Sequence, residues 1–511
     1  MKIAAIDVGS NSIHLVVVET DAVGNQQVLA RENHMVRLAK GVLRTGAIAP
    51  EAFQAGLEAL ALMAEVIRGF QCETVMACGT AALREAANAP LFIQEAAALG
   101  IPIRVISGEE EAGLIYLAVS RAIPFPDEPT VLMDIGGGST ELTWILSGRA
   151  VASISLPWGL QRLADAVPTS MPPTPEELAR LRKFIRKILK KAGKGLPSGL
   201  PEARLVLGTS GTLLDLAKGA SGSANFDLHQ LLRFKRKLWK VTPQQRVETL
   251  GVEPKRAEVL HVGASWAAGL LEWLGADQVR CLPVGLREGM VWQALARGGM
   301  ALPALSERRK ASVEALAGRL DPDPGHSRHV RDLADQLFQD LQPYFDLGDP
   351  ERELLGYACR LHDVGLSVAE KGHQKHGAYL ILNANPAGFW NSEIETLSQI
   401  VRYHRGKAPN AANHEIFASL KPWTQHVVEK CAAILRVCDA LDRTRRQVVR
   451  QVRLVPDGDD CTLVVSGSGD LRPELDSLQD KGRLLFRLLD RTVKVVVVEP
   501  EVAAPARTLA K

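Results

Sequence analysis

Hydrophobic and polar residues follow two different periods along the first 300 residues of this 511-residue chain. Short apolar runs, such as residues 3–6 and 131–133, are typical of buried strands. Between such runs, apolar residues recur at helical spacing, most clearly over residues 51–70. Strands that alternate with helices in this way predict α/β domains built on largely parallel sheets.

The pattern changes twice further along the chain. From about residue 301 to 450 it is almost entirely helical and rich in histidine, and short strands are predicted beyond residue 450. Proline-rich residues 123–129 and the glycines and prolines near residue 300 interrupt regular structure. We therefore predict two α/β domains, an all-α domain and a small α+β domain, over residues 1–124, 125–300, 301–450 and 451–511.

Two glycine-rich turns of the same design lie about a domain's length apart. Asp7 ends a predicted strand and precedes Gly9, Ser10 and Asn11; Asp134 likewise precedes Gly136, Gly137, Gly138, Ser139 and Glu141. Glycine permits positive φ and lets a phosphate approach main-chain N–H groups closely. Aspartates at this place can hold a divalent cation against the same phosphates. The repetition predicts a duplicated phosphate-binding fold with a cleft between its halves.

Three further segments are candidates for the same cleft. The turn over residues 208–212 contains Gly208, Thr209, Ser210 and Gly211, and the turn over residues 79–84 ends at Arg84, whose guanidinium suits phosphate oxygens. Three consecutive acids, residues 109–111, begin a predicted helix. Carboxylates also favour helix N-termini for structural reasons, so that interpretation stays open for Glu109 and Glu110.

Together these motifs resemble the exopolyphosphatase/guanosine pentaphosphate phosphohydrolase (Ppx/GppA) family of the actin–hexokinase superfamily. The matching residues are 5–12, 37–38, 82–84 with Asn88, Ser107-Gly108-x-x-Glu111-Ala112, 134–141, 208–212 and 285–289. The resemblance implies two actin-like (ribonuclease H-like) α/β domains. It also implies that Glu111, placed in register by Ala112, is the general base that activates water.

The same resemblance implies Mg²⁺ near Asp7 and Asp134, with Glu141 supporting the metal or the water. The residues that we expect to bind phosphate are Gly9, Ser10, Asn11, Arg84, Gly136, Gly137, Gly138, Ser139, Gly208, Thr209, Ser210 and Gly211. Two glycine turns, an arginine and Mg²⁺ would neutralise phosphate charge, and one carboxylate would orient water.

The histidine-rich region resembles the HD domain, an all-helical metal-dependent phosphohydrolase fold. The resemblance implies a first metal on His326, His362, Asp363 and Asp439, with His376 and His404 as candidates for a second site. Imidazole and carboxylate together suit Mn²⁺, Fe or Zn²⁺. The alternative is a scaffold whose histidines only form hydrogen bonds.

Charge and composition narrow the partners. A net charge of +3 gives no global reason to expect nucleic acid, and 5% aromatic residues argue against base-stacking platforms. Basic residues do cluster at 175–194 and 233–240, which predicts either a track for polyphosphate or solvated helix faces. The N-terminus enters a predicted strand at once, and no apolar run is long enough to span a bilayer, so we expect neither a signal peptide nor membrane contact. The seven cysteines are scattered, which is typical of a reducing cytoplasm, and we therefore expect a cytoplasmic protein.

The leading hypothesis is an exopolyphosphatase that processively removes terminal orthophosphate from inorganic polyphosphate. The alternative is hydrolysis of guanosine pentaphosphate (pppGpp) to the tetraphosphate (ppGpp) in the same site. A kinase and a non-enzymatic polyphosphate or alarmone sensor are further alternatives, disfavoured because no acceptor motif is evident and because Glu111 is present. The family resemblance also implies a homodimer.

Overall fold

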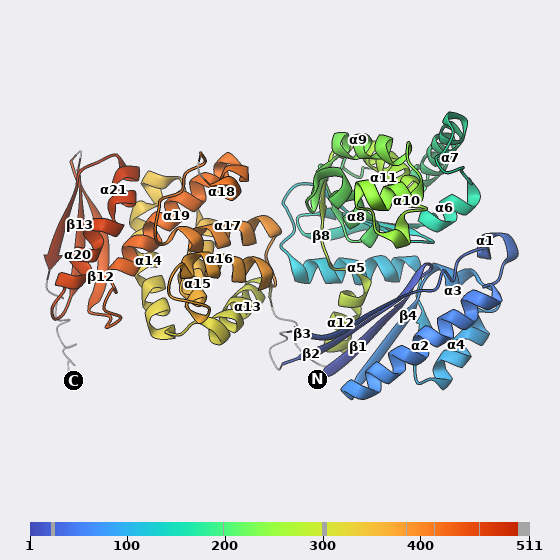
Figure 1. Ribbon diagram of the computed structural model, residues 1–511, viewed down its shortest axis with the longest axis horizontal. Coiled ribbons are helices and arrows are strands. Elements are labelled where there is room, and N and C mark those ends of the chain that lie inside the picture. The colour runs from blue at the N-terminus through green and yellow to red at the C-terminus, as the bar shows by residue number, and fades with distance from the viewer. Residues whose placement is uncertain are drawn as a thin grey trace, which may run out of the picture. The chain divides into compact units, whose positions relative to one another are not determined.

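A computed structural model describes residues 1–21, 26–197, 199–298, 304–384, 386–412, 414–458 and 460–498. By compactness the chain divides into two units, Met1–Ala304 and Leu305–Lys511, which run from blue to yellow-green and from yellow to red in Figure 1. The boundary expected at 300/301 lies outside the described residues.

Unit 1, Met1–Ala304, contains two sheets of matching topology. Over the described residues their strand orders are β3-β2-β1-β4-β5 and β10-β11-β9-β6-β7-β8. In each, an antiparallel meander (β1 to β3, β6 to β8) is extended by parallel strands (β4 and β5, β9 and β11). The strands are β1 (Lys2–Val8), β2 (Ser12–Thr20), β3 (Gln26–Met35), β4 (Thr74–Gly79), β5 (Ile103–Val105), β6 (Thr130–Ile135), β7 (Thr140–Leu146), β8 (Arg149–Leu156), β9 (Leu205–Gly208), β10 (Asn225–Asp227) and β11 (Gln278–Cys281).

Each sheet has a hydrophobic core of its own. The helices of unit 1 are α1 (Val42–Thr45), α2 (Pro50–Phe70), α3 (Ala81–Glu85), α4 (Ala89–Ala98), α5 (Gly108–Ala122), α6 (Leu160–Ala166), α7 (Pro175–Gly193), α8 (Gly211–Ser221), α9 (Leu228–Leu238), α10 (Pro243–Leu250), η1 (Pro254–Arg256), α11 (Leu260–Leu274) and α12 (Leu286–Arg297). Figure 1 shows α2 and α4 on one side of the first sheet and α12 on the other.

Two helices cross between the halves of unit 1. Helix α5 follows β5 of the first sheet but packs on β7 and β8 of the second, and α12 follows β11 of the second sheet but packs on β1 of the first. Where α5 and α12 meet, a Cβ on Gly289 would overlap the Leu114 carbonyl, with the carbonyl carbon at 2.6 Å. The division expected at 124/125 separates the two cores, and the crossing helices join them.

Helix α10 of unit 1 carries a buried arginine, Arg246. Arg246 is fully buried and donates from Nε to the Leu238 carbonyl (3.1 Å) and from Nη1 to the Ala257 carbonyl (2.6 Å) and to His261 Nδ1 (3.1 Å). Because the guanidinium can only donate, His261 must accept at Nδ1 and stay neutral, with its Nε2 hydrogen directed to Thr169 Oγ1 at 2.9 Å. Burial, and next the Arg246 charge, lower the pKa of His261 to about 3.

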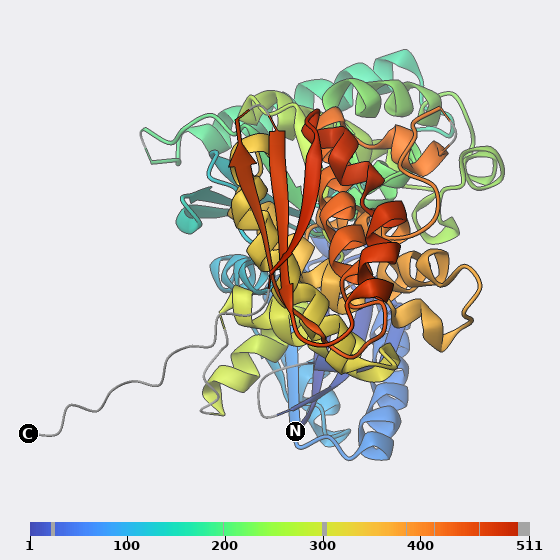
Figure 2. The ribbon, with the colours of Figure 1, turned by 90° about the vertical axis from the view of Figure 1, so that its left-hand side faces the viewer.

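Unit 2, Leu305–Lys511, joins helices and a small sheet in one continuous hydrophobic core. Its elements are α13 (Leu305–Leu320), α14 (Pro324–Phe345), α15 (Asp349–Leu361), η2 (Val364–Ser367), α16 (His373–Ala384), α17 (Asn391–Tyr403), α18 (Glu415–Ser419), α19 (Pro422–Ala440), β12 (Val449–Asp457), β13 (Asp460–Gly467), α20 (Arg472–Lys481), α21 (Arg483–Leu489) and β14 (Val493–Val498). Figure 2 shows the sheet β12-β13-β14 face on, beside α20 and α21. The boundary expected at 450/451 therefore falls within a shared core.

The helix expected near 480–489 is instead two helices that meet at Gly482. A Cβ there would lie 2.6 Å from the Leu478 carbonyl oxygen, so the last turn of α20 closes tightly on this glycine. Among the described residues, no helix combines the length and the apolar character needed to cross a membrane.

We predict that Gly289→Ala destabilises unit 1 by about 2 kcal/mol or more, because the added methyl forces α12 away from the α5 backbone. The matched control is Gly113→Ala on α5, where a Cβ meets no atom within 4 Å and helix propensity improves. Urea unfolding followed by tryptophan fluorescence measures both. Equal stability of the two variants would contradict the close packing at the crossing.

His261 predicts a pH dependence of stability. Its pKa is lower in the folded state than in an unfolded chain, so its contribution is complete above about pH 6.5 and is lost as the pH falls. Between pH 7 and 5 the wild type should lose about 2 kcal/mol more unfolding free energy than His261→Gln, which takes up no proton. The exposed His229, changed to Gln, is the control and should leave the wild-type slope unchanged.

Candidate active site and histidine cluster

A cavity of about 320 Å³ lies between the halves of unit 1. It is lined by the β1–β2 turn, the β6–β7 turn and the N-terminal residues of α8 and α12. Of the residues expected at the site, the lining includes Asp7, Gly9, Ser10, Asn11, Glu111, Asp134, Gly136, Gly137, Gly138, Ser139, Thr209, Ser210 and Gly211. Arg84, Glu141 and Gly208 are not among the lining residues. Arg84 donates to Glu111, Glu141 pairs in register with Asp134, and Gly208 precedes Thr209.

The two glycine turns have the same hydrogen bond. Gly9 N donates to the Ser12 carbonyl (3.1 Å), and Gly136 N donates to the Ser139 carbonyl (3.0 Å). No backbone carbonyl of the described residues accepts from the amides of Ser10, Asn11, Gly137 or Gly138. These amides line a cavity and can donate to the oxygens of an anion.

Close packing, not positive φ, accounts for the glycines in these turns. The backbone φ of Gly9 and of Gly136 to Gly138 lies outside the left-handed region. The expectation that these turns need glycine for positive φ is therefore wrong. A Cβ on Gly138 would overlap Ser10 Oγ and lie 2.8 Å from Ala81 Cβ, and one on Gly137 would lie 3.2 Å from Asn11 Cβ. The turns of the two halves therefore press against each other at the cleft.

Four carboxylates gather at or beside the cavity, of which Glu111 and Glu141 are buried and Asp7 and Asp134 are half-buried. Asp7 and Asp134 lie near the ends of β1 and β6, Glu111 lies in the first turn of α5, and Glu141 pairs in register with Asp134. Burial is the main cause that raises the pKa of all four, to about 7 for Asp7 and for Glu111. Asp134 Oδ2 accepts from Thr209 Oγ1 at 2.7 Å.

The carboxylates fit a divalent cation. Asp7 Oδ1 and Glu141 Oε2 are buried and accept no hydrogen bond from the described residues. Buried like charges without partners are unfavourable unless a cation neutralises them. Donors that are all oxygen match Mg²⁺, which prefers carboxylates, water and phosphate oxygens.

Among the three consecutive acids, Glu111 is the one that reaches the cavity. Arg84 Nη1 donates to Glu111 Oε2 (3.0 Å) and to the Ile106 carbonyl (2.8 Å). Glu110 instead completes the N-terminal capping box of α5 and pairs with Arg104 at 2.6 Å, while Glu109 is exposed. Arg84 therefore orients the carboxylate of Glu111, which differs from the phosphate contact that we expected.

Two arginines that the sequence analysis did not single out line the cavity. Arg256 extends from η1, forms an ion pair with Asp215 and packs against Gly211, where a Cβ would overlap its guanidinium. Arg287 lies in the first turn of α12 and lowers the pKa of Asp7 against the effect of burial. The signal for Arg287 was its place within the motif at residues 285–289.

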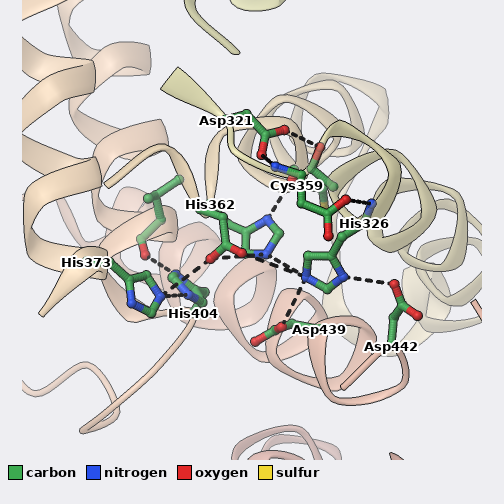
Figure 3. Close-up of polar contacts among 12 residues, drawn as sticks. Asp321, His326, Cys359, His362, His373, His404, Asp439 and Asp442 are labelled. Carbon is green, nitrogen blue, oxygen red and sulfur yellow. Dashed lines mark hydrogen bonds and ion pairs between the residues drawn. The ribbon is translucent and has the colours of Figure 1, made fainter. Parts of the chain in front are cut away.

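Unit 2 brings six of the histidine and aspartate side chains together. His326 Nε2 lies 3.3 Å from His362 Nε2 and 3.5 Å from Asp439 Oδ1, and His373 Nε2 lies 3.2 Å from His404 Nε2 and 3.5 Å from Asp363 Oδ1. Figure 3 shows these imidazole rings turned toward one another. Burial by itself would lower the pKa of His326, but hydrogen bonds with Asp439 and Asp442 raise it to about 9. Burial lowers the pKa of His404 to about 3.

The cluster contains His373 where we expected His376. His373 begins α16 and is buried, with Nδ1 on the Glu370 carbonyl at 3.0 Å; His376, nearly a turn later, is not part of the group. Asp442, which the sequence analysis did not name, accepts from His326 Nδ1 at 2.8 Å. The spacing of two histidines on one predicted helix did not show which of them faces the core.

Comparisons with known proteins agree with this architecture. Residues 16–297 match the model of the Ppx/GppA phosphatase family, and residues 308–469 match that of Ppx/GppA phosphatase, domain III. The chain belongs to the Ppx/GppA phosphatase family. It is accordingly a hydrolase of the phosphatase class.

Solved structures match more than half of the chain. An exopolyphosphatase from Cytophaga hutchinsonii is similar at 24% identity and a TM-score of 0.53, over 59% of this chain and 99% of its own. The Aquifex aeolicus member of the Ppx/GppA family is similar at 26% identity and a TM-score of 0.50, over the same shares. An exopolyphosphatase-like protein is similar at 25% identity and a TM-score of 0.52, over 57% of this chain and 97% of its own. The two expected actin-like α/β domains are confirmed.

We predict that Asp7→Asn uncouples Mg²⁺ from the stability of unit 1. At about a hundred times its dissociation constant, Mg²⁺ should stabilise the wild type by about 2.7 kcal/mol and the variant hardly at all. Without Mg²⁺ the variant should melt higher than the wild type, because one buried like charge is gone. Thermal melting with and without Mg²⁺ measures both effects. The exposed Asp165, changed to Asn, should behave as the wild type.

Proposed function

We propose that the cavity of unit 1 hydrolyses the terminal phosphoanhydride of inorganic polyphosphate and releases orthophosphate. The observation that carries the proposal is a buried carboxylate, Glu111, held by Arg84 in a cavity that two amide-bearing glycine turns also line. A water-activating base near an anion-binding pocket is what hydrolytic phosphoryl transfer requires.

Each group then has a defined part in the reaction. Ser10, Asn11, Gly137 and Gly138 bind the terminal phosphates through their amides, and Arg287 and Arg256 add positive charge to the same cavity. Arg84 occupies Glu111 Oε2, so the other carboxylate oxygen is left to take a proton from the attacking water. Asp7, Asp134 and Glu141 would hold Mg²⁺, which neutralises charge on the phosphate oxygens when bound.

Polymer is favoured over nucleotide by surface charge. Exposed cations lie along α7 and also on α9. Those on α7 are Arg180, Arg182, Lys183, Arg186, Lys187, Lys190 and Lys191, and those on α9 are Arg233, Arg236 and Lys237. Such a surface attracts a long polyanion, and this attraction weakens as the salt concentration rises. A solved relative is named exopolyphosphatase-like, which agrees with this choice. Hydrolysis of guanosine pentaphosphate is the second candidate because it needs the same cavity. That the protein forms a homodimer stays a prediction.

The decisive experiment measures orthophosphate released from long-chain polyphosphate with Mg²⁺. Glu111→Gln should lower turnover about 10²- to 10⁴-fold with the melting temperature preserved, because the base is lost and the side-chain volume is not. Glu109→Gln, two residues away and exposed, is the matched control and should keep the wild-type rate.

The same assay separates the alternatives. Faster release from guanosine pentaphosphate than from polyphosphate would select the second candidate. A kinase transfers the phosphoryl group to an acceptor instead of water, and a sensor transfers none, so neither would release orthophosphate. Full activity in Glu111→Gln would show that another group is the general base and would overturn the mechanism.

A further inference from the structure

Unit 1 has a second cavity, of about 660 Å³, between three of its helices. Helices α7 and α9 both pack on α11, and residues of all three line the cavity together with Trp239, which directly follows α9. It shares no lining residue with the cleft that the glycine turns line. A cavity of this size accommodates a small organic ligand.

The buried part of the lining, here called the floor, is mostly aliphatic. Ile185 and Leu189 of α7 and Ala268 of α11 are buried there. The one hydroxyl of the lining, that of Ser265, already donates to the His261 carbonyl at 2.8 Å. A heterocyclic base would need several polar partners at this depth, whereas an alkyl chain needs none. The floor therefore favours an alkyl chain.

Cations gather around the same cavity. Three of them follow one another at four-residue intervals on α7, so they share a face of that helix, and two lie near the end of α9. Among the described residues none of the five takes part in an ion pair, although Arg180 on α7 pairs with Glu177, and the lining contains a single acid, Glu272. The five cations are Arg182, Arg186, Lys190, Lys235 and Arg236.

Lys235 connects the cations with the apolar lining. Its side chain is half-buried, and its Nζ lies 5.0 Å from the centroid of the Trp239 ring. Burial lowers the pKa of Lys235, and the charge of Glu272 only partly opposes this change. An anion bound beside the ammonium group would stabilise its charged form.

Inorganic polyphosphate accounts for the cations but not for the floor, because it has no apolar part to place there. A ligand that uses both has an anionic group at one end and an alkyl chain at the other. We propose that the cavity between α7, α9 and α11 binds an amphiphile with a phosphate head, whose alkyl chain lies on the floor and whose head contacts the cations. This inference is independent of the hydrolysis proposed for the cleft.

The first test titrates alkyl phosphates into the full-length protein by calorimetry, without Mg²⁺ and below the concentrations at which they form micelles. One molecule should bind per chain, and each step from octyl to decyl to dodecyl phosphate should tighten binding about 10-fold, because two more methylenes leave water. Tripolyphosphate should bind at least about 100-fold more weakly than dodecyl phosphate. Equal affinities for all four compounds would show that only the cations bind and would overturn the proposal.

The second test uses variants on the same two helices. Lys190→Gln and Lys235→Gln should each weaken dodecyl phosphate binding about 10-fold, because each removes a cation from the lining. Lys187→Gln and Lys237→Gln are the matched controls, since these lysines are exposed on α7 and α9 but do not line the cavity, and they should bind as the wild type does. Equal losses in all four variants would indicate a general surface charge effect and overturn the site.

The floor has a test of its own in Leu232→Gln, which places an amide in the half-buried lining. This variant should abolish the dependence of affinity on chain length. If its melting temperature falls, the lysine variants still decide whether the cavity binds the head.

Vesicles of phosphatidylglycerol distinguish a free amphiphile from a membrane lipid as its source. Binding of dissolved dodecyl phosphate alone would indicate a free amphiphile, and vesicle binding that is also lost in Leu232→Gln would indicate a membrane lipid. Vesicle binding without any binding of dissolved dodecyl phosphate would overturn the cavity site, because the cations would then contact only the bilayer surface.

Discussion

The contact of α12 with α5 determines where the two sheets of unit 1 can lie. Gly289 brings the helices together so closely that no side chain fits between its Cα and the Leu114 carbonyl. Each helix follows one sheet in sequence and packs on the other, so the crossing joins two separate cores. The N-terminal turns of the same helices carry Glu111 and Arg287 into the cleft. One backbone contact thereby fixes the spacing between a carboxylate and a cation that lie far apart in the sequence.

Both candidate sites concentrate groups that repel one another in the absence of a ligand. In unit 1 two buried and two half-buried carboxylates lie together, and in unit 2 Nε2 of His373 lies 3.2 Å from Nε2 of His404. Such arrangements cost stability unless a counter-charge is bound, so the surrounding fold must supply the difference. The sheets do so in unit 1, where strand pairing fixes Asp134 and Glu141 side by side. In unit 2 the continuous core of helices and sheet has the same effect.

The sequence was sufficient for features that depend on neighbouring residues. The glycine turns, their aspartates and the position of Glu111 follow from short motifs, and the repeated order of strands confirms the duplication that these motifs predicted. The sequence could not predict which face of a helix packs on the core or which distant residue a side chain contacts. His373 and His376 differ by less than one turn, and only the packing of α16 selects the first. Arg84 has the right chemistry for phosphate but lies within reach of Glu111, a contact across 27 residues. Lys481, whose Nζ donates to Asp439 Oδ2, belonged to no motif in the sequence.

Donor chemistry separates the two sites further. The cleft of unit 1 offers carboxylates and backbone amides, whereas the cluster of unit 2 offers four imidazoles and two aspartates. Imidazole nitrogens bind Mn²⁺, Fe or Zn²⁺ far more tightly than Mg²⁺, which prefers oxygen and keeps much of its water. Scarce transition metals would therefore fill the cluster first, at concentrations that leave the cleft to the more abundant Mg²⁺. The two donor sets therefore differ in the ion that they favour, although Mn²⁺ suits carboxylates as well as imidazoles.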